Sequence, residues 1–129
     1  MKISGKLKRA AVAATAAGVL SGVVIAGTAA AASASTIPGG TVQICAQGNY
    51  TAYIVFPYRG GFASTLVPRG QCWINYMGGN SWEPIKVYGV WNTHPDQSFY
   101  IGTEWYDGAV SGIGIGAEGS TTSPYLWTW

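Results

Sequence analysis

The polar and apolar positions after residue 40 alternate with a period of two. The segment Val42-Gln43-Ile44-Cys45 shows this alternation most simply, and further runs of β-branched and aromatic residues follow at 50–56, 62–67, 71–77, 84–91, 98–105 and 109–117. Because successive side chains of a strand point to opposite faces, the pattern predicts strands with one buried face. No segment in this part of the chain has the spacing of a long amphipathic helix.

Turn-forming residues separate these runs. Gly, Pro, Asn and Asp gather at 47–49, 59–61, 68–70, 78–80, 93–96 and 107–108, and such clusters mark turns. Roughly seven or eight short strands in this arrangement predict an all-β fold, a small antiparallel β-sandwich or a partly open barrel.

Glycines occupy every second position late in the chain, at Gly112, Gly114 and Gly116. Alternation then points Ile113 and Ile115 toward the core and leaves the opposite side of the strand bare. A bare side allows a backbone or an aromatic ring to approach closely. A flexible glycine-rich loop is the alternative interpretation.

The first 34 residues have a different composition. Four basic residues within the first nine are followed by residues 10–32, which are small or apolar and uncharged, and an Ala-Ser-Ala pattern at 32–34 fits a signal peptidase site. The alanine-rich style resembles that of exported proteins of high-GC Gram-positive bacteria. We expect residues 1–34 to be a signal peptide removed near Ser35, which leaves one secreted domain at 35–129. A retained membrane anchor is the alternative, because this apolar stretch could cross a bilayer of roughly 30 Å.

Loss of the leader reverses the sign of the net charge. The chain has seven Lys and Arg against five Asp and Glu, and four of the basic residues lie in the leader, so Arg59, Arg69 and Lys86 remain and the net charge becomes −2. So few cations provide no basic patch for nucleic acid and no attraction to an anionic membrane. We expect neither partner for the domain.

Both cysteines, Cys45 and Cys72, follow the leader. An even cysteine count in an exported chain predicts a disulfide, and two cysteines allow only one pairing. Two free thiols in a metal site are the alternative, but no second cysteine pair or nearby histidine would complete such a site.

Residues for catalysis or metal binding are few. His94 is the single histidine, it lies in a Thr-His-Pro-Asp turn pattern, and no Gly-x-Ser-x-Gly motif accompanies it. A domain of this size leaves little room for the paired carboxylates of a glycosidase cleft, and no Asp-rich calcium loop occurs. We therefore expect no enzyme activity, no cofactor and no metal ion.

The chain has a surplus of aromatic residues after residue 40, with six Trp, eight Tyr and three Phe. Alternation places Phe99 and Trp105 on the buried side of one strand. It places Glu104 on one face with Tyr100 and Tyr106, either as a solvated carboxylate or as a polar contact in a ligand site. A small core cannot hold every ring, and we expect several to reach water: Tyr58, Trp73, Trp82, Tyr88 and Tyr106.

The final residues are the most distinctive local feature. Tyr125, Trp127 and Trp129 lie on one face of an extended segment, and Leu126 and Thr128 lie on the other. Tyr and Trp combine a large apolar area with a polar group, which suits stacking on sugars or anchoring a protein interface. A last core strand is the alternative. The ligand-binding residues that we expect are Tyr125, Trp127, Trp129, Glu104 and Tyr106.

Two turns present an arginine between Pro and Gly, at 56–61 and 67–72. The first turn resembles the Trp-Arg-Tyr loop of the small β-sandwich inhibitors of α-amylase, although here the order is Tyr58-Arg59 with a proline before it, and only one disulfide is available. The resemblance implies an inhibitory turn at Tyr58 and Arg59, and Arg69 offers a second one. Solvated hairpin arginines are the alternative.

These patterns together predict a small secreted, non-catalytic β-sandwich that acts by extracellular binding. We expect a polysaccharide or cell-wall glycan as the ligand, ahead of a secreted protein. An inhibitor of an extracellular hydrolase and a structural cell-surface protein are the alternatives.

Overall fold

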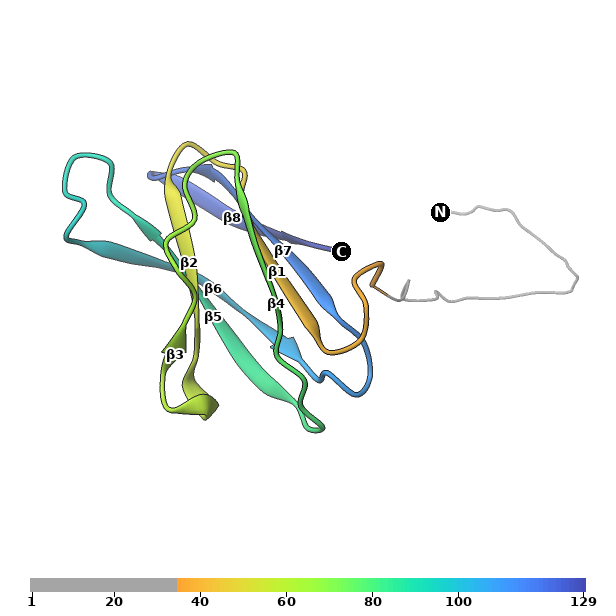
Figure 1. The fold of residues 1–129 in the computed structure, drawn as a ribbon. Coiled ribbons are helices and arrows are strands. Elements are labelled where there is room, and N and C mark those ends of the chain that lie inside the picture. Colours follow the sequence, from red (N-terminus) through yellow and green to blue (C-terminus); the bar gives the residue numbers. More distant parts are fainter. Residues whose placement is uncertain (1–34) are drawn as a thin grey trace, which may run out of the picture. The chain divides into compact units, whose positions relative to one another are not determined.

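The computed structural model describes residues 35–129, which form two four-stranded sheets packed face to face (Figure 1). The expected signal peptide at 1–34 lies outside the described residues. Sheet A has the strand order β4-β1-β7-β8, and sheet B has the order β3-β2-β5-β6. The all-β sandwich predicted from the alternation is therefore confirmed. The strands are β1 (Thr41–Ala46), β2 (Thr51–Phe56), β3 (Phe62–Ala63), β4 (Cys72–Tyr76), β5 (Glu83–Val90), β6 (Ser98–Tyr106), β7 (Ile113–Ser120) and β8 (Ser123–Thr128).

Neighbouring strands run antiparallel except for β1 and β7, which pair in parallel from Val42 opposite Ile113 to Ala46 opposite Ala117. Between these two strands the chain passes through all four strands of sheet B and through β4. Parallel strands cannot be joined by a tight turn, and this long connection allows β1 and β7 to pair in parallel within sheet A.

The core lies between the inner faces of the two sheets. Every second residue of β1 and β2 is fully buried, and these side chains meet others from β5 and β7. The packing follows directly from the alternation in the sequence, because one face of each strand is apolar. The largest fully buried side chains are Val42, Ile44, Tyr50, Ile54, Phe56, Val67, Ile85, Val87, Tyr106 and Ile115.

Two expected strands are shorter than their sequence runs. The run at 62–67 forms only β3 and an isolated bridge between Ala52 and Val67. The run at 109–117 becomes β7 only from Ile113, because Asp107 starts a turn in which its side chain accepts a hydrogen bond from the Ala109 amide at 3.0 Å.

A β-bulge in β6 reverses the expected order of faces. Val87 pairs with Gly102, whereas Tyr88 pairs with Tyr100, so Ile101 is the extra residue. After a bulge the alternation restarts with the opposite sense. Trp105 is consequently 54% exposed on the outer face of sheet B, and the expected burial of Trp105 beside Phe99 is wrong.

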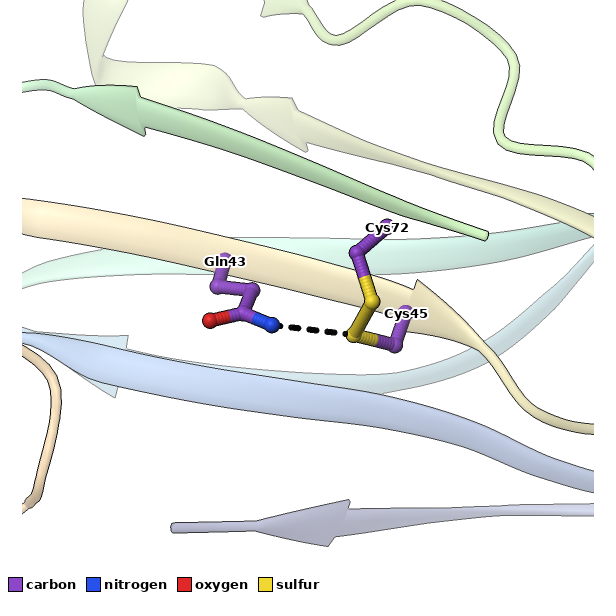
Figure 2. Close-up of a disulfide and its surroundings, with 3 residues drawn as sticks. All are labelled: Gln43, Cys45 and Cys72. Atoms are coloured by element: carbon purple, nitrogen blue, oxygen red, sulfur yellow. Dashed lines mark hydrogen bonds between the residues drawn. A yellow bond between two sulfur atoms is a disulfide. The ribbon is translucent and has the colours of Figure 1, made fainter. Parts of the chain in front are cut away.

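The predicted disulfide is present between Cys45 and Cys72, which lie directly opposite each other on β1 and β4. Figure 2 shows the bridge with the side-chain amide of Gln43, whose Nε2 donates to the Cys45 sulfur at 3.2 Å. Within residues 35–129, no helix is long and apolar enough to cross a membrane.

Candidate binding face

The outer surface of sheet A, hereafter the A face, gathers most of the aromatic tail. On β7, Ile115 and Ala117 point into the core, so Gly114, Gly116 and Glu118 point outward. On β8, Leu126 packs against the core, and Tyr125 and Trp127 are exposed on the other side. The A face therefore has two bare glycine positions beside a row of large rings.

The Trp129 ring covers the first of these glycines. The backbone N–H of each residue donates to the carbonyl of the other, at 2.9 Å from Gly114 and 3.0 Å from Trp129. A Cβ atom added at Gly114 would overlap the indole ring. The expectation that the alternating glycines allow an aromatic ring to approach closely is thus confirmed, and it explains why Trp129 is only partly exposed.

Two polar side chains lie over the second glycine. A Cβ added at Gly116 would lie 2.6 Å from Oε2 of Glu118 and 2.7 Å from Oε1 of Gln47. Gly116 is directly opposite Trp127 on β8, and Glu118 is directly opposite Tyr125. A carboxylate and an amide therefore lie next to two exposed rings.

The backbone that carries this polar pair is held by the core. The amide of Gln47 donates to the carbonyl of Ala117 at 2.9 Å. The hydroxyl of the fully buried Tyr50 donates to the carbonyl of Glu118 at 2.6 Å. Burial and the nearby charge of Glu118 raise the pKa of Tyr50 to about 12, so this hydroxyl remains a donor at ordinary pH.

On the far side of the A face lie the disulfide and two exposed apolar residues of β4, Ile74 and Tyr76. Glu118 is the single charged side chain on the A face among the residues that the structure describes. The other side chains of the face are uncharged, and they include Gln43, Cys45, Gln47, Cys72, Ile74, Tyr76, Tyr125, Trp127 and Trp129.

Two residues expected in the ligand site lie elsewhere. Tyr106 is 2% exposed, and its hydroxyl donates to the carbonyl of Gly78 at 2.7 Å. The expectation that its ring reaches water is therefore wrong. Glu104 pairs with Ile85 and faces the inside of the sandwich, whereas Tyr100 lies on the outer face opposite Tyr88. The bulge at Ile101 is the reason for both corrections, and burial raises the pKa of Glu104.

Arg59 is held by contacts within the domain. Its Nε and Nη2 donate to the Glu83 carboxylate, with a shortest distance of 2.6 Å, and its Nη1 donates to the Met77 carbonyl at 2.6 Å. The hydrogen bond to Glu83 raises the pKa of Arg59. The neighbouring Tyr58 is exposed, but the guanidinium cannot enter an enzyme pocket unless these bonds break.

Arg69 is presented differently. It is exposed on a turn in which Gly70 has a φ of 80° and donates its amide to the Ala46 carbonyl at 2.7 Å. Only left-handed backbone of this kind, which glycine adopts without strain, closes the turn there. The side chain reaches the Asn49 carbonyl at 3.5 Å.

The outer face of sheet B is also aromatic, but three of its rings contact one another, while Trp105 lies apart from them. Tyr53 stacks on Tyr88 with ring centroids 5.4 Å apart, and Tyr100 meets Tyr88 edge-on at 5.7 Å. These cross-strand contacts stabilise the sheet and occupy ring surface that a ligand would need. The A face is for this reason the better candidate.

Glu118 and Gln47 were not expected as site residues. The sequence contains a signal for Glu118. This residue continues the every-second-position series of Gly114 and Gly116, and therefore points to the same side of the strand. Gln47 could be placed beside it only with knowledge of the parallel pairing of β1 and β7.

Comparison with known proteins yields little. No family model matches the chain, and no curated protein matches it. Among solved structures, the chain is similar to wild-type pneumolysin with a TM-score of 0.46 and 16% identity, over 70% of this chain. The match spans 23% of the pneumolysin chain.

Proposed function

We propose that the protein is a secreted, non-catalytic binding module whose A face takes a polysaccharide or a cell-wall glycan. The observation that carries the proposal is the position of the Glu118 and Gln47 oxygens beside the exposed rings of Trp127 and Tyr125. The leader pattern and the Cys45–Cys72 bridge support secretion, because disulfides form in oxidising compartments.

The chemistry of a sugar ring matches this arrangement. A pyranose has an apolar face of C–H groups and a rim of hydroxyls. An indole or phenol ring can stack on the apolar face, while a carboxylate and an amide form hydrogen bonds with the hydroxyls. The A face supplies both kinds of contact on adjacent strands.

Two exposed tryptophans on opposite sheets provide a matched test. Trp127 is 62% exposed on the A face, and Trp105 is 54% exposed on sheet B. In pull-down assays on chitin, cellulose and peptidoglycan, we expect Trp127→Ala to weaken binding about thirtyfold, which corresponds to about 2 kcal/mol for a central ring. Trp105→Ala should leave binding unchanged. Equal losses in the two variants, or no glycan binding by the unaltered protein, would contradict the proposal.

Binding through rings should depend little on salt. At about 1 M salt the Debye length is roughly 3 Å, so charge attraction between exposed groups is screened. We expect the pull-down to persist at that concentration.

Inhibition of an extracellular hydrolase is a second candidate function. Arg69 is a better candidate than Arg59 for its inhibitory residue, because Arg69 is exposed on a hydrogen-bonded turn. Loss of hydrolase inhibition in Arg69→Ala, in a protein that binds no glycan, would assign the protein to that class.

A further inference from the structure

Glu118 holds a position on the A face that no other charged residue shares. Among residues 35–129, the other charges lie on the inside or at the ends of the sandwich, on sheet B, or in loops. They are the Arg59–Glu83 pair, Arg69, Lys86, Asp96, Glu104 and Asp107. A ligand on the tryptophan and tyrosine rings would therefore meet one charged side chain of the A face, and it is negative.

The carboxylate also lies close to where the ligand would lie. Residues directly opposite on paired strands have Cβ atoms roughly 5 Å apart, and Glu118 is opposite Tyr125 while its Oε2 lies over Gly116, opposite Trp127. A ligand that covers both rings would displace water around this carboxylate. Like charges brought together in such a place repel strongly.

The two oxygens that lie over Gly116 are both hydrogen-bond acceptors. Neither Oε2 of Glu118 nor Oε1 of Gln47 accepts a hydrogen bond from the part of the chain that the structure describes. The hydroxyls of a neutral sugar are donors and would satisfy both oxygens. A ligand carboxylate or sulfate has no proton to donate.

We propose that the A face selects neutral, hydroxyl-rich glycans and excludes anionic ones, and that Glu118 is the residue that determines this selectivity. The inference rests on the proposed function, since it names the ligand class for the same face.

A matched pair of polymers tests the selectivity. Cellulose and cellulose carboxylated at C6 share one backbone and differ in charge. We expect the exported protein to bind the neutral polymer at least tenfold more tightly at about 50 mM salt. The isosteric Glu118→Gln should reduce this ratio to less than threefold. Because the repulsion is removed, the carboxylated polymer should bind more tightly than it binds the unaltered protein, while binding of the neutral polymer should weaken because a charged hydrogen-bond acceptor is lost.

Glu104→Gln is the control with the same change in net charge. Glu104 faces the inside of the sandwich and lies on the other sheet, so its substitution should leave the ratio unchanged. Arg69→Gln shows whether the cation at the end of β1 contributes, and we expect it to leave the ratio within twofold.

The outcomes separate the two proposals. Equal binding of the two polymers by the unaltered protein, or an unchanged ratio in Glu118→Gln, overturns the role of Glu118. In either case, neutral binding that depends on Trp127 leaves the proposed function standing. Absence of binding to both polymers, and to chitin and peptidoglycan, overturns both.

Discussion

Arg59 lies in a turn that the sequence suggests is exposed, but in the fold its side chain forms an ion pair with Glu83. Glu83 is nearly buried, with 8% of its side chain exposed, and Arg59 forms its ion pair at 2.6 Å. Removal of one partner of such a pair leaves the other as an uncompensated charge.

We therefore expect Arg59→Ala to lower the free energy of unfolding by about 3 kcal/mol, measured by urea titration. The solvated Arg69→Ala is the matched control and should stay within about 0.5 kcal/mol of the unaltered protein. A fully stable Arg59→Ala would show that the ion pair does not hold the turn, and would return Arg59 to the candidates for an inhibitory contact.

Glu104 should affect the dependence of stability on pH. Burial raises its pKa above the ordinary value of about 4.5, so the folded protein holds the proton more tightly than the unfolded chain does. Such a group is favourable to folding below its unfolded pKa and becomes unfavourable as the pH rises through its folded pKa.

Glu104→Gln removes that unfavourable charge. We expect the variant to melt at a higher temperature than the unaltered protein at pH 7, and the difference to shrink toward pH 3, as measured by scanning calorimetry. A variant that is less stable at pH 7 would indicate that the carboxylate makes a favourable contact there.

At the level of the strands, β6 shows where the sequence misleads. Its composition predicts a strand correctly, but an extra residue at Ile101 moves Trp105 outward and Glu104 and Tyr106 inward. Gly102 was the available signal, because a glycine inside a strand often marks a bulge. The position of the extra residue could not be read from it, since the bulge depends on the pairing with β5.

The glycine strand β7 is the opposite case. Strict alternation predicts the inward isoleucines and the bare outer side, and the rings of β8 use that side as expected. No bulge interrupts the pairing of β7 with β8, so the side chains alternate between the two faces as the sequence predicts.

Gly116→Ala tests whether the bare side positions the polar pair. The added methyl group would meet only the ends of two flexible side chains, at 2.6 Å and 2.7 Å, and both can rotate away. We expect the free energy of unfolding to change by less than about 1 kcal/mol, while glycan binding falls several-fold because Glu118 and Gln47 leave their places. Fluorescence titration with a soluble glucan and a urea titration measure the two effects. Unchanged binding would mean that the polar pair does not contact the ligand.

At the level of the whole molecule, the sequence predicts the sandwich and the disulfide but not the sheet order. Alternation and turn spacing are local properties, and the even cysteine count leaves one pairing. The parallel contact of β1 with β7 joins segments about 70 residues apart, and contacts at such separation depend on how both sheets pack. The site could not be predicted for the same reason, because the pairing of β1 with β7 is what brings Gln47 next to Glu118.

The disulfide should contribute much of the stability of this domain because of where it lies. It joins β1, whose inner side chains are buried, to the edge strand β4, whose residues are mostly exposed. Little apolar burial holds β4, so its attachment relies on backbone pairing and on the bridge. In the chain-entropy model, a loop of 27 residues is worth about 3.5 kcal/mol.

Reduction of the bridge should therefore lower the melting temperature by roughly 15 °C or more, since 1 kcal/mol moves the midpoint by about 4–8 °C in a domain of this size. Circular dichroism with and without a phosphine reductant measures the shift, and a Cys45→Ala/Cys72→Ala variant should already melt at the reduced value and ignore the reductant. The rings of β8 belong to the other edge of sheet A, beyond β7. At temperatures where the reduced protein remains folded, glycan binding should consequently persist. Loss of binding on reduction without unfolding would place the ligand contact at β4 instead, beside Ile74 and Tyr76.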